Sequence, residues 1–318
     1  MQRKIVIGYD LEHGGSDALR LGRLFAEVLA GQPIVFSALP WPRYLMGLEH
    51  LQKQVDVGMH DRFDVIRDEL QDLGVEPQAV AVASPSAAEA LHEFAEREGA
   101  AMVVLGSCHR GPLGRTLAGS VGESLMHGAS CAISIAPHGY AERSQAPLLR
   151  IAVAFDGSAE AWPALETGIG LAERCHARLT VISVADYPSY GYAAAWSVLT
   201  AEDITDYEEE EKRRLLDLAL GRIPAGLESE GRLLTGDAGS VLSEVSGGFD
   251  LIVTGSRAYG PLRRTLLGST TRKLIRDSAC PVLVLPRAVG VDPLGLRSGL
   301  TPNTAAGEPI GTGVRQPV

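Results

Sequence analysis

The sequence lacks the features of a membrane, secreted or nucleic-acid-binding protein. No window approaches the roughly 18 consecutive apolar residues that a membrane-spanning helix needs. The N-terminus runs directly into a strand-like segment at residues 5–7, without the apolar stretch of a signal peptide. The 318 residues include 29 basic and 39 acidic side chains, and the net charge of -10 disfavours non-specific binding to phosphate backbones. We therefore expect a cytoplasmic protein that binds neither membranes nor nucleic acid.

Cysteine is scarce, and the common enzyme signatures are missing. The four cysteines form no Cys-x-x-Cys pair and no zinc-like cluster with histidine, which favours free thiols in a reducing compartment. Cys131 and Cys280 are expected to be buried just before a strand, with redox sensing as the less favoured alternative. The sequence contains no P-loop, no His-Glu-x-x-His, no Gly-x-Ser-x-Gly and no dinucleotide-binding glycine motif after a strand.

What the sequence does contain is an internal repeat. The hydrophobic and charged fractions, 45% and 21%, are those of a globular protein, and the length predicts two domains. The matching segments occur in the same order along the chain: 4–10 with 150–156, 102–107 with 251–256, 111–120 with 260–269, and 131–137 with 280–286. This shared order indicates a tandem duplication, with one domain at 1–140 and a second at 147–287.

Each copy has the sequence pattern of an α/β fold. Short apolar runs alternate with longer segments of helical periodicity, which predicts two doubly wound, Rossmann-like domains, each a five-stranded, mainly parallel sheet with helices on both faces. In the first copy, strands are expected near residues 3–9, 33–38, 78–83, 101–106 and 131–136. In the second copy, strands are expected near 150–155, 178–185, 230–235, 249–254 and 281–285, and helices near 159–175, 202–221, 238–247 and 269–278.

Two segments are expected to face solvent. The acidic run 208–211 is followed by the basic run 212–214, which places opposite charges three and four residues apart on a helix. We interpret this as a solvated helix surface rather than a charged docking face. Residues 288–318 are rich in glycine and proline without apolar periodicity, which predicts a flexible C-terminal tail.

Residues with ligand-binding chemistry gather where the strands end. An open parallel sheet binds ligands beyond the carboxyl ends of its strands, where glycines admit a close approach and a helix N-terminus attracts anions. In the second copy these residues are Asp156, Val184, Gly255, Ser256, Gly268, Ser269 and Thr270. In the first copy they are Asp10, Gly106, Gly119 and Ser120. The set suits a nucleotide, with its base and ribose at the first two strands and its phosphates in the loop after the fourth.

The spacing of these glycines resembles a family motif, Gly-x2-Gly-x9-Gly followed by Ser or Thr. The second copy has Gly255, then Ala258 and Gly268-Ser269 at this spacing, and the opening strand ends in Asp156. Over about residues 1–287 the chain resembles a tandem universal stress protein with two UspA-type domains. The resemblance implies ATP binding, and it implies that the last strands, near 133–135 and 282–284, pair within the chain as an intramolecular pseudo-dimer.

The two copies depart from the motif to different degrees. The second glycine is replaced by Ala258 in the second copy and by His109 in the first. An added methyl group costs little where φ is negative, whereas an imidazole blocks or contacts a phosphate. Basic residues are more numerous around the second loop, at Arg257, Arg263, Arg264, Arg272, Lys273 and Arg276, than around the first, at Arg110 and Arg115. We therefore expect the second copy to hold the better site.

Three functions remain open at this point. The resemblance favours a stress-response protein that binds ATP or a related adenine nucleotide, with or without Mg²⁺, and at most hydrolyses it slowly, with no catalytic residue identified. The first alternative is a tandem interaction module that has lost nucleotide binding and acts through regulatory protein partners, as a pseudo-dimer or a homo-oligomer. A true phosphotransferase or ATPase is disfavoured because the P-loop lysine and paired metal carboxylates are absent.

Overall fold

The second copy folds as the sequence predicts. The computed structural model describes residues 2–10, 14–40, 78–109, 116–117, 120–126, 130–143, 147–185, 201–256, 268–286 and 294–296. The strands of the second copy are β8 (Arg150–Ala154), β9 (Arg178–Ala185), β10 (Ser229–Thr235), β11 (Leu251–Gly255) and β12 (Val282–Leu285). Its helices are α5 (Ala161–Cys175), α6 (Ala201–Leu220), α7 (Ala238–Val245), the short 3-10 helix η2 (Ser246–Gly248) and α8 (Ser269–Asp277). Every expected strand and helix of this copy is confirmed to within two residues.

The first copy repeats this order of elements. Its main strands are β1 (Lys4–Gly8), β2 (Gln32–Pro40), β3 (Gln78–Ser84), β4 (Met102–Gly106) and β7 (Ala132–Ala136). Its described helices are α1 (Gly15–Leu29), α3 (Ala87–Glu98) and α4 (Ser120–Met126). A small antiparallel hairpin, β5 (Cys108–His109) with β6 (Thr116–Leu117), follows β4, and β6 lies against α8 of the other copy. The sequence did not predict this hairpin.

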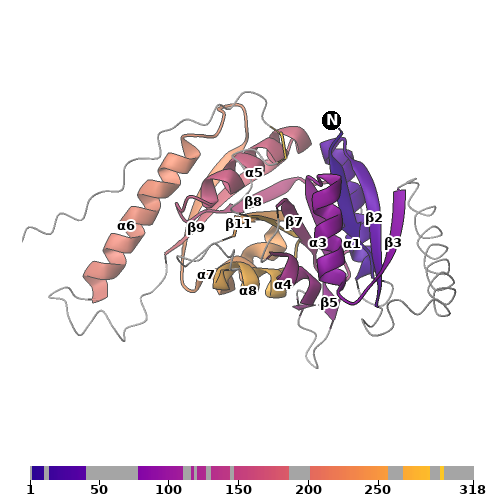
Figure 1. The fold of residues 1–318 in the computed structure, drawn as a ribbon. Helices are drawn as coiled ribbons and strands as arrows, with labels where there is room; N and C mark the ends of the chain where they lie inside the picture. The colour runs from indigo at the N-terminus through magenta and orange to yellow at the C-terminus, as the bar shows by residue number, and fades with distance from the viewer. Residues whose placement is uncertain are drawn as a thin grey trace, which may run out of the picture.

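The two copies share one ten-stranded sheet, in the order β10-β9-β8-β11-β12-β7-β4-β1-β2-β3. Within this sheet, all strand pairs that belong to one copy are parallel, and the copies join where β12 pairs antiparallel with β7, with Leu283 opposite Ser134. Each of these strands would otherwise be an exposed edge of its own half-sheet, so their pairing satisfies backbone groups on both. Figure 1 shows the result, with β3 at one side of the molecule and α6 at the other. The family resemblance had implied a pairing of these same segments.

Two helical layers cover the sheet because its central strands are apolar on both faces. In β1, for example, Ile5 and Ile7 pack in one core cluster and Val6 packs in the other. One cluster includes residues of α1, α5 and α6, and the other includes residues of α3, α4, α7 and α8. Alternate side chains of a strand point to opposite faces, so a continuous apolar run is the expected sequence of a strand buried on both sides.

The C-terminal segment differs from its prediction as a flexible tail. Leu294 is only 1% exposed and belongs to the core cluster that contains residues of α1 and α5. Arg3 holds this segment, because its Nε donates to the carbonyl oxygen of Leu294 at 2.5 Å and its guanidinium also donates to Gly295. The expectation is therefore corrected for residues 294–296. Apolar side chains without periodicity, such as Leu294 and Leu296, carry little signal of packing in the sequence, and both pack here against a core cluster formed by distant segments.

Candidate functional site

A pocket lies at the carboxyl ends of β8, β9 and β11 in the second copy. Its volume is about 250 Å³. Its walls are formed by Ala154, Phe155, Asp156, Ser158, Ala161, Ile182, Val184, Glu208, Lys212, Ala238, Leu242, Thr254, Gly255, Gly268, Thr270 and Thr271. Five of the seven residues expected in this copy line the pocket, namely Asp156, Val184, Gly255, Gly268 and Thr270. Ser256 and Ser269 are next to these residues in the chain but do not line it.

Strand register explains why distant residues meet at this pocket. Ala154 of β8 lies opposite Thr254 of β11 on one side and opposite Ile182 of β9 on the other. All three residues line the pocket. Parallel strands in register bring their carboxyl ends to one edge, so segments separated by some seventy residues supply one surface.

The Asp156 carboxylate is oriented by the turn that follows β8. Its Oδ1 accepts a hydrogen bond from the backbone N–H of Ser158 at 2.9 Å. Between them, Gly157 has φ +82°, in the left-handed region that favours glycine. A Cβ at Gly157 would also lie 2.6 Å from Leu215 Cδ1, so α6 packs directly on this turn. The turn thus orients the Asp156 carboxylate at the pocket, and α6 packs on the turn.

Gly255 allows a close approach of two backbone segments. A Cβ at Gly255 would lie 2.5 Å from the carbonyl oxygen of Glu160, at the start of α5. Thr271 Oγ1 donates to the Gly255 carbonyl at 3.3 Å and so joins α8 to the end of β11. The neighbouring Ser256 is 1% exposed, and its hydroxyl has no hydrogen-bond partner in the described part of the chain. Its backbone N–H donates to Leu285 at 2.9 Å.

The N-terminus of α8 points its first turn at the pocket. Gly268 is the N-cap residue, with φ -62° and ψ 151°, and it supplies no side-chain cap. Thr270 and Thr271, the second and third residues of the helix, line the pocket. The first backbone N–H groups of a helix have no partner within the helix, and the helix dipole adds partial positive charge there. This end of the pocket is therefore suited to an anion.

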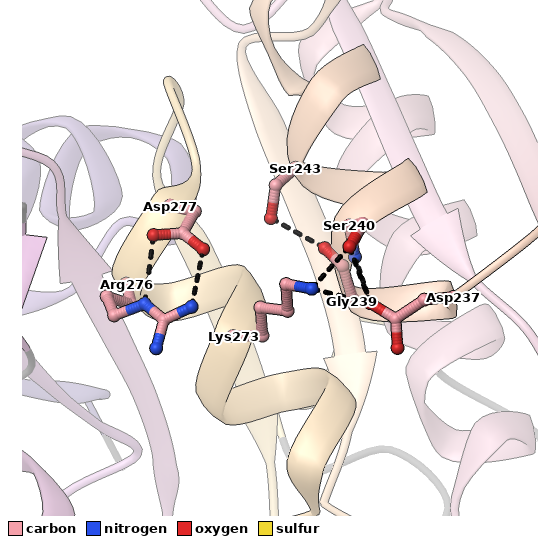
Figure 2. A network of polar contacts seen from close by, with 7 residues as sticks. All are labelled: Asp237, Gly239, Ser240, Ser243, Lys273, Arg276 and Asp277. Carbon is pink, nitrogen blue, oxygen red and sulfur yellow. Dashed lines mark hydrogen bonds and ion pairs between the residues drawn. The ribbon is translucent and has the colours of Figure 1, made fainter.

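An ion pair joins α8 to α7, the two helices of one pocket wall (Figure 2). Asp237 caps α7 by accepting from the Ser240 N–H at 2.9 Å, and Lys273 of α8 donates to Asp237 Oδ1 at 2.7 Å. Lys273 also contacts the Ser240 hydroxyl, which itself donates to Asp237 at 2.6 Å. The bond from Lys273, with those from Ser240, lowers the pKa of Asp237 to about 2. The ion pair between Lys273 and Asp237 thus links α8 to the N-terminal end of α7.

The basic residues expected around the loop have other partners or lie outside the described residues. Lys273 pairs with Asp237, and Arg276 pairs with Asp277 at 2.8 Å (Figure 2). Arg257, Arg263 and Arg264, together with Ala258, lie outside the described residues. Among the described residues that line the pocket, the positively charged side chain is that of Lys212 in α6. Its Nζ donates to the Asp156 carbonyl oxygen at 3.1 Å.

The sequence missed the contribution of α6. The charged run that contains Glu208 and Lys212 was expected to be a solvated surface, and for these two residues that prediction is wrong because both line the pocket. A signal was present: Glu208, Lys212 and Leu215 recur at helical spacing, so they lie on the same face as the buried part of α6. The charges of this run led to its interpretation as a solvated surface.

At the corresponding place in the first copy, apolar side chains pack closely on the end of β1. The register pairs Gly8 with Phe36, as it pairs Ala154 with Ile182, and Leu105 takes the place of Thr254. A Cβ at Gly8 would lie 2.5 Å from Leu105 Cδ2 and 3.2 Å from Leu91 Cδ2. Phe36 is 2% exposed. The first copy therefore has a leucine packed against Gly8 where the second copy has Thr254, which lines the pocket.

The glycine contact is nevertheless preserved in the first copy. A Cβ at Gly106 would lie 1.9 Å from the Gly14 carbonyl oxygen, a contact like that of Gly255. Asp10 is described at the end of β1 and is exposed. Gly119 and the side chains of His109 and Ser120 lie outside the described residues.

Both thiols that were expected to be buried are buried, at 6% exposed for Cys131 and 5% for Cys280. Burial raises the pKa of Cys131 and of Cys280 to about 12. Within the described residues, no group of three or more His, Cys, Asp or Glu side chains is placed to hold a metal ion. None of the helices in that part of the chain is long and apolar enough to cross a membrane.

Comparisons with known proteins agree with the repeat. The model of the universal stress protein family matches residues 1–137 and again 148–286. A universal stress protein of Staphylococcus epidermidis is 28% identical over 139 residues, which are 42% of this chain and 82% of that protein. One from Staphylococcus aureus is 29% identical over 141 residues, with the same coverage. The crystal structure of a universal stress protein from Archaeoglobus fulgidus covers 89% of this chain and 98% of its own, with a TM-score of 0.63 at 18% identity. That likeness shows a shared fold.

Proposed function

The chain belongs to the universal stress protein family, and we propose that it binds ATP or a related adenine nucleotide in the pocket of its second copy. The bound nucleotide would serve a stress-response or regulatory role through binding rather than turnover. The observation that carries the proposal is the convergence of Asp156, Gly255 and the N-terminus of α8 on one pocket. These parts come from three separate segments and supply an acceptor for hydroxyls, close backbone approach and donors for an anion.

The residues that line the pocket include each kind of group that a nucleotide requires. Ile182, Val184 and Leu242 make one part apolar, which suits a base. The carboxylate of Asp156 suits a ribose hydroxyl or a Mg²⁺ ion carried by the phosphates. The first turn of α8 suits the phosphates.

The second copy is proposed as the better site for a reason different from the one the sequence offered. Leu105 of the first copy packs on Gly8, whereas the equivalent residues of the second copy, Thr254 and Ala154, line the pocket. A ligand would have to displace packed apolar side chains in the first copy, and each displaced leucine costs about 2 kcal/mol of lost burial. We therefore expect one nucleotide per chain.

Two measurements test the proposal. The full-length protein is purified without added nucleotide and denatured, and released small molecules are identified by mass spectrometry. The emptied protein is then titrated calorimetrically with ATP, AMP and adenosine. Near-stoichiometric release or binding of an adenine nucleotide is the expected result, and an empty protein that binds none would favour the interaction module instead.

A matched pair of variants tests the choice of copy. Asp156→Ala removes a hydrogen-bond acceptor that we expect to contribute about 1–3 kcal/mol to the binding free energy, so ATP affinity should fall about tenfold or more. Asp10→Ala makes the same change at the equivalent place in the first copy and should leave affinity unchanged. If only Asp10→Ala weakened binding, the assignment to the second copy would be reversed.

A further inference from the structure

The helix α6 contributes two charged side chains to the pocket of the second copy. Glu208 and Lys212 lie one turn apart on this helix and both line the pocket. The Lys212 ammonium is partly buried and donates to the carbonyl oxygen of Asp156 at 3.1 Å. An ammonium carries three N–H donors, so one bond to a carbonyl leaves capacity for a ligand. Lys212 thus stands beside the residue that we expect to contact the ribose.

Packing holds Lys212 in this position. Leu215, three residues further along α6, packs on the turn at Gly157, where a Cβ would lie within 2.6 Å of it. The next turn of α6 is anchored by Leu216, 5% exposed, and by fully buried Ala219. Residues three apart lie on the same side of a helix, so the contact of Leu215 directs Lys212 at the same turn. The packed residues of α6 thus fix the backbone from which the Lys212 side chain extends into the pocket.

The charges that line the described part of the pocket do not favour an anion without Lys212. They are the carboxylates of Asp156 and Glu208 and the ammonium of Lys212. Two carboxylates alone would repel a phosphate, and the partial charge of the α8 N-terminus would have to overcome both. Lys212 therefore lowers the net negative charge of this part of the pocket from -2 to -1 and supplies its cationic hydrogen-bond donor.

We propose that Lys212 is a specificity-determining residue that contacts an anionic oxygen of the bound nucleotide and makes the pocket select phosphorylated ligands over the uncharged nucleoside. Glu208 acts in the opposite sense on the same wall and limits the affinity for ligands of high negative charge. This inference rests on the proposed function, because it assigns a role within the same site.

Calorimetric titration of adenosine, AMP and ATP into four forms of the full chain tests the inference. Lys212→Met should weaken AMP and ATP binding about ten- to hundredfold, since a bond between charged groups is lost, and should change adenosine affinity less than twofold. Glu208→Gln should raise the affinity for ATP severalfold and leave adenosine unchanged. Arg214→Ala is the control, because Arg214 is an exposed cation of the same helix that pairs with Glu211 at 2.7 Å and lies outside the pocket wall.

The outcomes separate this inference from the proposal on which it rests. If the wild-type protein binds none of the three ligands, the proposed function fails and the role of Lys212 fails with it. If the wild type binds and Lys212→Met weakens adenosine and ATP equally, or weakens neither, the site stands but Lys212 does not select charge. An equal loss of ATP affinity in Arg214→Ala would also overturn the inference, because it would show an effect of overall charge.

Discussion

Replacing Gly268 by aspartate should strengthen the fold and weaken nucleotide binding at the same time. Gly268 is the N-cap of α8, with φ -62° and ψ 151° and no side-chain cap. This is an extended conformation that any residue adopts at an N-cap, and aspartate is among the preferred caps. Its carboxylate would accept from the backbone N–H of Thr270 or Thr271 and would interact favourably with the helix dipole. We expect a gain of about 0.5 kcal/mol in stability.

The effect on binding should be larger and of opposite sign. The aspartate would occupy the same N–H groups that we expect to bind phosphate, and it would place a negative charge about 4 Å from the phosphate. A repulsion of about 2–4 kcal/mol in a partly solvated site corresponds to a thirty- to thousandfold loss of ATP affinity. Adenosine has no phosphate, so its affinity should change little.

The assay combines calorimetric titration of ATP and adenosine with thermal unfolding. Gly268→Asn is the matched control, because its amide oxygen caps the same N–H groups without charge, and its ATP affinity should lie between those of wild type and Gly268→Asp. Gly119→Asp makes the equivalent change in the first copy and should not affect binding. A folded Gly268→Asp protein that binds ATP as well as wild type would refute the placement of phosphate at α8.

Three further predictions follow from the described contacts. Deleting residues 288–318, or changing Leu294 to alanine, should lower the melting temperature by about 5 °C or more because a buried leucine is lost; an unchanged melting temperature would mean that this segment is not docked. The pKa of Asp237 is lowered to about 2, so its stabilising contact should be present above about pH 4 and lost as the pH falls towards 2. Urea unfolding of Asp237→Asn should therefore differ from wild type at pH 6 and converge with it near pH 2, whereas a constant difference would contradict this. Because burial raises the pKa of Cys131 and Cys280 to about 12, both thiols should react with a disulfide reagent only after unfolding, and rapid labelling of either in the native protein would contradict their burial.

The positions of the strands and helices could be read from the sequence because they depend on local patterns. Strands such as Leu251–Gly255 are short, continuous apolar runs, and helices such as Ala161–Cys175 have apolar residues at helical spacing. Glycine is equally informative where two backbones touch, as at Gly106 and Gly255, because any Cβ there would collide with a carbonyl oxygen. The repeat of both patterns identified the two copies and the family.

Parts of the site could not be predicted because they depend on side chains that meet only in the folded chain. Lys212 belongs to a charged run typical of a solvated helix, yet the packing of Leu215 on Gly157 brings it into the pocket. Leu294 lies in a segment rich in glycine and proline, yet it is buried. The partner in each case is far away along the chain, so local pattern alone does not identify the contact.

The sequence by itself determined the duplication, the order of elements in each copy and the glycine spacing that marks the family, because these are properties of residues near one another in the chain. Only the tertiary structure showed how side chains pack at the ends of the equivalent strands. Leu105 and Thr254 occupy equivalent places at the end of equivalent strands, and the leucine closes over Gly8 whereas the threonine leaves a pocket beside Ala154. The physical reason is that the backbone pattern is compatible with either side chain, and the space that remains for a ligand depends on how side chains from several strands and helices fill it.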